Sequence, residues 1–261
     1  MPELPDVEAY RRFFAEHAAG RRVRRVAVLD PVSVRNVEPS TLDRALGGRT
    51  FAEPDRHGKW LVAWTDGPAL LLHFGMTGDL IWSGDEPERH RHDRVILELE
   101  GGDELRYRNM RKLGGAWLAH DPDEAVAVMG GLGPDALDVS RRRFHDLLAR
   151  RRGGLKAVLM DQRFVAGLGN LLVDELLWQA RFHPRRPVQT LDATDRDRLY
   201  GEMRRVLRRW VAGYGRLPRR GTWFASVRGR DERCPRCGSA LERSTTAGRT
   251  TYHCPRCQPA P

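Results

Sequence analysis

The chain has 261 residues, 40% of them hydrophobic, and a formal net charge of +10. This length suits two domains, each with its own core. The basic excess indicates a polyanionic partner, most often nucleic acid, and no apolar run approaches the roughly 18–20 residues that a membrane span needs.

The N-terminal segment, residues 1–20, predicts a helix behind a rigid leader. Val7, Tyr10 and Phe14 recur at helical spacing, and Gly20 is a natural stop. The first six residues carry acidic side chains and no apolar stretch, so they do not resemble a signal peptide. We therefore expect a soluble cytoplasmic protein that acts as a monomer and does not engage a membrane.

The next hundred residues are rich in short apolar runs separated by Gly, Asp and Pro turns. Such spacing predicts an all-β sandwich or barrel. Together with the leader helix, residues 1–120 are expected to form a β-sandwich domain. Residues 121–138 carry Pro and several Gly, and are expected to be a linker.

Residues 139–220 have helical periodicity and predict a helical domain. Two of its helical runs flank a bend in which Gly167 and Gly169 allow a tight turn. Asn170 falls where the second run begins. It can serve as a plain N-cap, or its helix N-terminus can face a phosphate, and the two roles are compatible.

The C-terminal segment, residues 221–261, contains all four cysteines. This placement excludes a disulfide framework spread over the fold. The cysteines form two C-x-x-C pairs with 16 residues between them: Cys234, Cys237, Cys254 and Cys257. A thioredoxin-like redox site would need one such pair near a βαβ unit, whereas two pairs at this spacing predict one structural Zn²⁺ held by four thiolates.

Between the two pairs, alternating residues predict a β-hairpin with its turn at Ala247-Gly248. Arg249 follows the tip. It is either one more solvated arginine or a phosphate contact held on a metal-stiffened hairpin. The sequence as a whole therefore predicts an α+β protein of two domains, the second ending in a zinc finger.

Only three of the 45 basic residues are lysines, namely Lys59, Lys112 and Lys156. A GC-rich coding bias explains the excess of arginine but not why three lysines remain. Lysine is a compact point charge on a flexible stem, whereas arginine is a planar fork. Each lysine is therefore a candidate for a position where arginine does not serve.

Six short segments, in this order, resemble the formamidopyrimidine-DNA glycosylase / endonuclease VIII family of base-excision repair enzymes. They are PELPDVE, RHGKWL, HFGMTG, GGLGPDALD, VAGLGN with its trailing FHP, and GRTTYHCPRCQ. The resemblance covers nearly the whole chain, from Pro2 to Gln258. It implies a β-sandwich domain joined to a helix–two-turn–helix domain with a zinc finger, and a partner that is double-stranded DNA with damaged bases or abasic sites.

The resemblance also implies which residues carry the chemistry. Pro2 becomes the N-terminus once Met1 is removed, and its secondary amine is then the nucleophile that attacks the sugar C1′. Glu3 is the acid–base partner that helps to open the sugar ring, and Lys59 reaches the phosphates or sugar beside the lesion. The implied activity is that of a bifunctional DNA glycosylase and abasic-site lyase.

The implied DNA-binding residues are Asn170, Arg249, Met76, Arg111 and Lys156. The first two pinch the phosphates that flank a flipped nucleotide. Met76 and Arg111 fill the gap left in the duplex. Lys156 lies at the start of the helical motif and has no more specific role.

Two residues depart from the family pattern. Asp6 stands where the family usually has Glu, which shortens the carboxylate arm by one methylene. Leu113 stands where relatives often have an aromatic wedge, and a leucine gains less from stacking between bases than a ring does. The second departure concerns the search for lesions rather than the chemistry.

Two questions stay open at this point. A catalytically inactive damaged-DNA-binding protein of the same fold would share the basic charge and the finger, but would not need Pro2, Glu3 and Lys59 together. The segment Gly213–Cys234 is short for the flexible cap of the 8-oxoguanine enzymes, so we expect an open pocket. Alternatively, Trp223 and Phe224 form a compact lid.

Overall fold

The structure is a computed structural model that describes residues 2–213, 215, 223–229 and 232–260. The chain divides into two compact units, Met1–Gly131 and Leu132–Pro261. The boundary expected at residue 220 between the helical domain and the finger lies outside the described residues. None of the described helices combines the length and the apolar character needed to cross a bilayer.

The first unit is built on two four-stranded antiparallel sheets, in the orders β1-β6-β7-β5 and β2-β3-β4-β8. The strands are β1 (Val23–Val28), β2 (Asp55–His57), β3 (Trp60–Trp64), β4 (Ala69–His73), β5 (Gly78–Trp82), β6 (Asp93–Leu99), β7 (Glu104–Asn109) and β8 (Gly115–Ala119). Inward side chains of both sheets, such as Leu72 and Leu97, form one buried cluster. This arrangement confirms the predicted β-sandwich.

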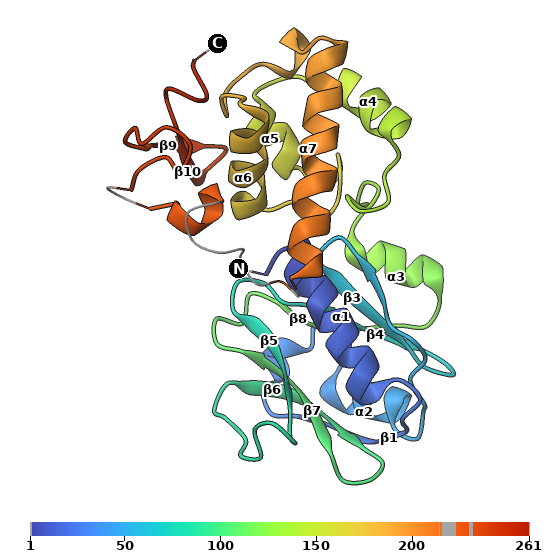
Figure 1. Cartoon of the computed structure of the whole chain (residues 1–261). Coiled ribbons are helices and arrows are strands. Elements are labelled where there is room, and N and C mark those ends of the chain that lie inside the picture. Colours follow the sequence, from blue (N-terminus) through green and yellow to red (C-terminus); the bar gives the residue numbers. More distant parts are fainter. Residues whose placement is uncertain (1, 214, 216–222, 230–231, 261) are drawn as a thin grey trace. The chain divides into compact units, whose positions relative to one another are not determined.

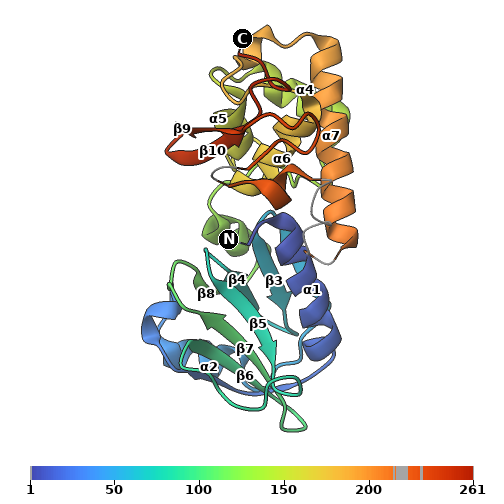
Figure 2. The same cartoon turned by 60° about the vertical axis from the view of Figure 1, so that its left-hand side comes forward.

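Helix α1 (Leu4–Ala18) packs against strands of both sheets, and Figure 1 and Figure 2 both show it beside β3 and β5. Its side chains Val7 and Phe14 enter the core between the sheets. The Tyr10 hydroxyl donates to the carbonyl of Gly78 at the start of β5 (3.1 Å). Two short helices, the 3₁₀-helix η1 (Pro31–Ser33) and α2 (Pro39–Leu46), follow β1. The start of α1 is thereby fixed relative to both sheets.

The segment 121–138, expected to be a linker, begins with a helix, α3 (Pro122–Met129). The Asp121 carboxylate caps it by accepting from the N–H of Glu124 (2.8 Å), and Gly130 ends it at φ 79°. Ala125 is buried among the tryptophans on the outer face of the second sheet. The Pro and Gly that favoured a linker are thus the start and stop signals of a helix.

The second unit is helical and ends in a β-hairpin, as predicted. Its helices are α4 (Arg141–Ala149), α5 (Leu155–Met160), α6 (Asn170–Ala180), α7 (Ala193–Ala212) and the 3₁₀-helices η2 (Val188–Thr190) and η3 (Phe224–Val227), and the hairpin is β9 (Glu242–Thr246) with β10 (Arg249–His253). Helix α6 contacts α7, η3 and β10, and lies between the hairpin and α7 in Figure 1. It is the central element of this unit.

Candidate active site and nucleic-acid interface

The leader residues Pro2 and Glu3 stand directly before α1, and Glu3 is its N-cap. The backbone N–H of Glu3 donates to Oδ2 of Asp6 (2.7 Å), and the N–H of Asp6 donates back to the carbonyl of Glu3 (3.0 Å). Pro5 lies in the first turn of the helix, where its missing N–H has no intrahelical partner to lose. These local contacts hold the leader in one conformation.

The Asp6 carboxyl belongs to this capping arrangement. The pKa of Asp6 is raised to about 6, mainly by burial and also by the Glu3 carboxylate, whereas the Glu3 N–H and the Lys59 ammonium act in the opposite direction. The Lys59 ammonium lies close enough to lower the pKa of Asp6, although 52 residues separate the two in the sequence. The structure therefore brings Glu3, Asp6 and Lys59 into one region of the first unit.

Lys59 occupies the two-residue turn between β2 and β3, beside Gly58, whose φ of 58° suits the turn. On the next strand, His73 pairs with Trp60 and its ring packs on the Trp60 ring with centroids 4.9 Å apart. Burial, helped by the nearby Lys59 ammonium, lowers the pKa of His73 to about 4. His73 is therefore a neutral imidazole near pH 7.

His73 is a candidate functional residue that our sequence interpretation passed over, although it opens the quoted segment HFGMTG. Its Nδ1 accepts from the N–H of Gly75 (3.3 Å), which leaves the proton of the neutral ring on Nε2. A neutral imidazole next to an ammonium can donate a hydrogen bond without adding charge.

The two predicted gap-filling residues, Met76 and Arg111, come from different loops of the first unit and meet. Arg111 donates from Nη1 to the sulfur of Met76 (3.1 Å), and its N–H donates to Oγ1 of Thr77 (3.0 Å). Leu113, in the same loop as Arg111, is 53% exposed. Met76, Arg111 and Leu113 thus form an exposed tip of the first unit, which carries a sulfur, a guanidinium and an isobutyl group.

Buried Asn109 supports this tip from below. Its Nδ2 donates to the Tyr107 hydroxyl (2.7 Å), and its Oδ1 accepts from the N–H of Lys112 (3.0 Å). Lys112 adopts φ 53° and forms an ion pair with Asp30 (2.6 Å). The lysine noted for its rarity therefore orders the loop that presents Arg111 and Leu113.

In the second unit, the glycine bend places Asn170 inside the first turn of α6 and not at its N-cap. Gly169 is the N-cap of α6 and Asn170 is the first helical residue, so the N-cap interpretation of Asn170 is wrong. The extended backbone of Gly169 takes the capping position one residue earlier. The side chain of Asn170 is consequently free to reach the finger, where its Nδ2 donates to the carbonyl of Thr250 (3.1 Å).

Arg249 directly precedes Thr250 and is exposed at the start of β10. The hairpin turn lies where it was expected, with Ala247 at φ 50° and Gly248 at φ 70°. Within the described part of the chain, the Arg249 guanidinium forms no ion pair and no hydrogen bond. The structure thus brings Asn170 and the residue next to Arg249 into contact across 80 positions.

Lys156, which the family resemblance predicts to be a DNA-binding residue, is completely buried. Its Nζ forms an ion pair with Oδ1 of Asp174 (2.6 Å), and both side chains have no exposed surface. A direct phosphate contact by Lys156 is therefore contradicted, because an ammonium so enclosed is neutralised inside the fold. The lysine at this position, unusual in so arginine-rich a chain, therefore forms an internal ion pair.

The four cysteines fit a single tetrahedral metal ion. All four sulfurs lie within 4.8 Å of one another, and two of the Sγ–Sγ distances, Cys234–Cys257 and Cys237–Cys254, are 3.9 and 3.5 Å. Zn–S bonds of about 2.3 Å in a tetrahedron place sulfurs about 3.8 Å apart. The finger therefore holds one structural Zn²⁺ in a closed site.

The finger is joined to the helical part of its unit by polar contacts around this site. The indole N–H of Trp178, on α6, donates to Sγ of Cys234 (3.3 Å), and the Arg236 guanidinium stacks on the Trp178 ring at 4.0 Å. Buried Gln258 donates to the carbonyl of Phe182 (2.9 Å). The metal site therefore fixes the hairpin relative to α6.

Trp223 and Phe224 do not form a lid. Both are fully buried, Trp223 edge-on against Trp210 and Phe224 stacked on Trp178. Both rings belong to the interior of the second unit, because they pack against side chains of α6 and α7. Much of the remaining segment between Gly213 and Cys234 lies outside the described residues.

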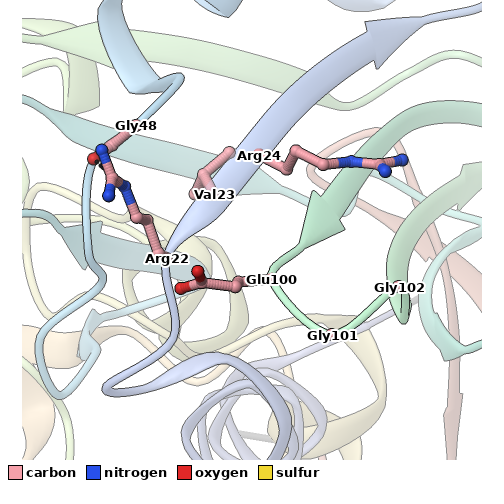
Figure 3. Close-up of a pocket in the computed structure, with 7 residues that line it drawn as sticks. All are labelled: Arg22, Val23, Arg24, Gly48, Glu100, Gly101 and Gly102. Carbon is pink, nitrogen blue, oxygen red and sulfur yellow. Dashed lines mark hydrogen bonds between the residues drawn. The ribbon is translucent and has the colours of Figure 1, made fainter.

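A hollow of about 340 Å³ in the first unit contains none of the predicted site residues. Figure 3 shows Arg22 extending toward Gly48 while Arg24 extends away from it, and glycine backbone closes one side. Arg22 donates to the carbonyl of Gly48 (2.9 Å), and Arg24 forms an ion pair with Glu98. These cations are paired within the fold, so the hollow is not a candidate for the chemistry.

Comparison with known proteins agrees with this geometry. Three family models match in succession: the formamidopyrimidine-DNA glycosylase N-terminal domain over residues 1–116, the formamidopyrimidine-DNA glycosylase H2TH domain over 131–217, and the zinc finger found in FPG and IleRS over 231–260. Together they account for most of the chain.

Full-length relatives give the same result. The formamidopyrimidine-DNA glycosylase of Symbiobacterium thermophilum is 37% identical, over 100% of this chain and 90% of the relative, and that of Moorella thermoacetica is 37% identical over 98% and 92%. A crystal structure of the Lactococcus lactis enzyme bound non-covalently to DNA with an AP site superposes with a TM-score of 0.89, at 27% identity over 99% of this chain and 100% of that one.

Fold, finger and relatives together define a DNA glycosylase of base-excision repair. Within that class, the chain belongs to the formamidopyrimidine-DNA glycosylase family.

Proposed function

We propose that this glycosylase removes oxidised bases from double-stranded DNA through a Schiff base on the amine of Pro2, and then nicks the strand as a lyase. The observation that carries the proposal is the capped leader, in which Pro2 and Glu3 precede α1 and lie in the same region as Asp6 and Lys59. A protein that only binds DNA has no need for this combination. The Lactococcus lactis relative was crystallised with DNA containing an abasic site or a Fapy-dG lesion, which supports the same substrate class here.

The amine of Pro2 suits the task because of its basicity. An α-amine has an unperturbed pKa of roughly 7.7–8.0, against roughly 10.4 for lysine, so a useful fraction is neutral and nucleophilic near pH 7. Attack of the Pro2 nitrogen on C1′ displaces the base with the electron pair of the glycosidic bond. Glu3 transfers the proton that opens the sugar ring, and an iminium joins Pro2 to C1′.

The iminium then serves as an electron sink. Loss of a proton from C2′ lets the electrons move toward the iminium, and β-elimination expels the 3′ phosphate and breaks the strand. Hydrolysis of the remaining iminium returns the free secondary amine of Pro2. Lys59, on its tight turn, places a positive charge for the phosphates or sugar beside the lesion.

The base must leave the duplex before any of this chemistry, at a cost of a few kcal/mol. Asn170 and Arg249 offset that cost by holding the phosphates on either side of the flipped nucleotide. Met76 and Arg111 enter the vacated space, since their exposed tip already pairs a polarisable sulfur with a planar guanidinium. The structural Zn²⁺ keeps the hairpin that presents Arg249 rigid.

Borohydride trapping on a duplex with one abasic site tests the proposal. We expect a covalent protein–DNA adduct, and peptide mapping should place it on the nitrogen of Pro2. A Pro2→Gly variant should still trap, because a primary amine substitutes for the secondary one, so the mapped position decides. An adduct on Lys59 would overturn the role of Pro2. Tight binding without an adduct or base release would favour an inactive damaged-DNA-binding protein.

The lesion preference is a separate prediction. A short segment between α7 and the finger leaves little chain to enclose an extruded purine, and pocket walls set the choice of base. With Trp223 and Phe224 buried, we predict that ring-saturated or fragmented bases and abasic sites are processed faster than 8-oxoguanine. Single-turnover assays on matched duplexes decide, and faster removal of 8-oxoguanine opposite cytosine would contradict the argument.

A further inference from the structure

Helix α6 and strand β10 are joined by side chains of the helix and backbone groups of the strand. Asn170 donates to the carbonyl of Thr250 (3.1 Å), and one turn further along, Asp174 accepts from the N–H of Tyr252 at 3.4 Å. Four helical residues rise about 6 Å and two strand residues about 6.6 Å, so the two contacts stay in register. The side of β10 that faces away from β9 is thus matched to α6.

Arg228, which follows η3, bridges these two contacts. Its Nε donates to Oδ2 of Asp174 (2.5 Å), its Nη2 donates to the carbonyl of Thr250 (2.7 Å), and its guanidinium lies 5.2 Å from the Tyr252 ring centroid. A planar guanidinium can hold two acceptors in fixed directions, which a lysine cannot. The carbonyl of Thr250 therefore accepts from Asn170 and Arg228 at once.

Asp174 is the fixed point of this network. It has no exposed side-chain surface and lies between two cations, Lys156 at 2.6 Å and Arg228 at 2.5 Å. A buried carboxylate is stable only while its partners remain, because losing one leaves an uncompensated charge. The buried lysine thus acts on the finger through Asp174 and Arg228.

We propose that Asp174 and Arg228 are positioning residues for phosphate binding by Asn170 and Arg249, an inference that rests on the phosphate-holding role proposed above. They fix the carbonyl of Thr250, which orients the Asn170 amide and the first residues of β10. The Asn170 Nδ2 carries two N–H groups, so one is held by Thr250 and the other remains for a phosphate. Arg249, one residue away, starts from the same anchored backbone.

Binding to a duplex with a tetrahydrofuran abasic-site analogue, measured for Arg228→Met, tests this inference. The variant keeps the apolar stem and removes both donors. Asp174→Asn is less suitable because it leaves Lys156 without its carboxylate inside the fold. Arg141→Met, which removes an exposed arginine paired with Asp197 in the same unit, is the control for the loss of one positive charge.

We expect Arg228→Met to weaken binding about tenfold, the size expected when a charge-assisted hydrogen bond is lost, and Arg141→Met to change it less than twofold. In an Asn170→Ala background, the effect of Arg228→Met should shrink to about twofold, because residues that act through one another are not additive. Zinc content should stay at one per chain, which separates positioning from loss of the finger.

The remaining outcomes separate a failure of the phosphate-holding role from a failure of the positioning inference. If Asn170→Ala and Arg249→Ala both bind as the native chain does, the phosphate-holding role itself fails. If Asn170→Ala and Arg249→Ala both weaken binding, the positioning inference depends on Arg228→Met. It is overturned if Arg228→Met does not change the affinity, if it changes the affinity no more than the Arg141→Met control does, or if its effect on the binding free energy is fully additive with that of Asn170→Ala. Full additivity with a salt slope lower by about 0.9 would make Arg228 a phosphate contact in its own right.

Discussion

The leader of the first unit and the hairpin edge of the second, which we propose binds phosphate, are held in place by different kinds of contact. Glu3, which directly follows Pro2, is held by a neighbour within one helical turn, through the mutual hydrogen bonds of Glu3 and Asp6. Asn170 and Arg249 depend on a partner 80 positions away, a buried ion network and a metal ion. The leader is thus ordered by contacts within one helical turn, whereas the groups that we propose to hold DNA are positioned by tertiary contacts.

This difference has a consequence for mutation. A change in the leader should alter a reaction rate while DNA binding persists, because the role proposed for Pro2 and Glu3 is in the chemistry and not in holding phosphates. A change in the finger should alter binding, because the hairpin presents Arg249 only while its metal and its contacts with α6 hold. Variants of the two regions should therefore separate rate from affinity.

The largest expected effect is that of Glu3→Gln. General acid–base catalysis contributes typically about 10²–10⁴-fold, and the amide cannot transfer the proton, so we expect the single-turnover rate of base removal to fall by about a thousandfold. Affinity for abasic-analogue DNA should stay within about twofold of the native value. A comparable loss of affinity would show that the leader also serves binding and would remove the contrast between the two regions.

Cys237→Ser should have the next largest effect, on binding. Losing one thiolate opens the closed site, and zinc content measured by metal analysis should fall well below one per chain. With the hairpin released, the contacts of Asn170 and Arg249 are lost together, about tenfold each, so affinity should fall about a hundredfold. Full zinc content with native affinity would show that the finger does not depend on this ligand.

Arg249→Ala should weaken binding about tenfold, similarly across DNA sequences, and lower the salt slope by about 0.9, as expected for one phosphate contact. Arg243→Ala is the matched control, because Arg243 is an exposed arginine on the other strand of the same hairpin. Equal effects of the two variants, or no effect of either, would support a merely solvated Arg249.

The sequence predicted the elements whose signals are local. Short apolar runs between turn residues predicted the β-sandwich, the spacing of the cysteines predicted the finger, and the Ala247-Gly248 turn lies where it was expected. Helix α3 was missed because Pro122 and Gly130 mark a linker and a helix boundary equally well. Only the burial of Ala125 under the tryptophans decides between these two structures.

The site was predicted less completely, because long-range pairing leaves no local signal. Lys156 was correctly singled out as unusual, but its partner Asp174 lies in another helix, so its burial was not visible in the sequence. Asn170 was placed at a helix start, yet its bond to Thr250 depends on how the finger docks. His73 was quoted within a motif and not recognised, since only its contact with Trp60 reveals its burial.

The smallest expected effect concerns Asp6 and the pH dependence of stability. The pKa of Asp6 in the folded chain is about 6, above its usual value of 3.8, mainly because it is buried. The folded state therefore binds this proton more tightly than the unfolded state does. The stabilisation is fully present below pH 3.8 and is lost as the pH rises through 6. Between pH 5 and pH 7 this group should remove about 1 kcal/mol of unfolding free energy.

Other carboxylates act in the opposite direction, so the measurement is a difference between variants. The free energy of unfolding is measured by urea unfolding, followed by circular dichroism, at pH 5 and at pH 7. Between these two pH values, the unfolding free energy of Asp6→Asn should fall by about 1 kcal/mol less than that of the native chain, or rise by about 1 kcal/mol more if the total change is positive. Glu53→Gln, which alters an exposed carboxylate of the same unit, should leave the interval unchanged. Identical pH dependence in Asp6→Asn and the native chain would mean that Asp6 is ionised throughout this interval. The Lys59 ammonium would then stabilise the Asp6 carboxylate more than burial destabilises it. The leader would then carry a permanent negative charge beside the amine of Pro2, and its nucleophilicity would not vary with the state of Asp6.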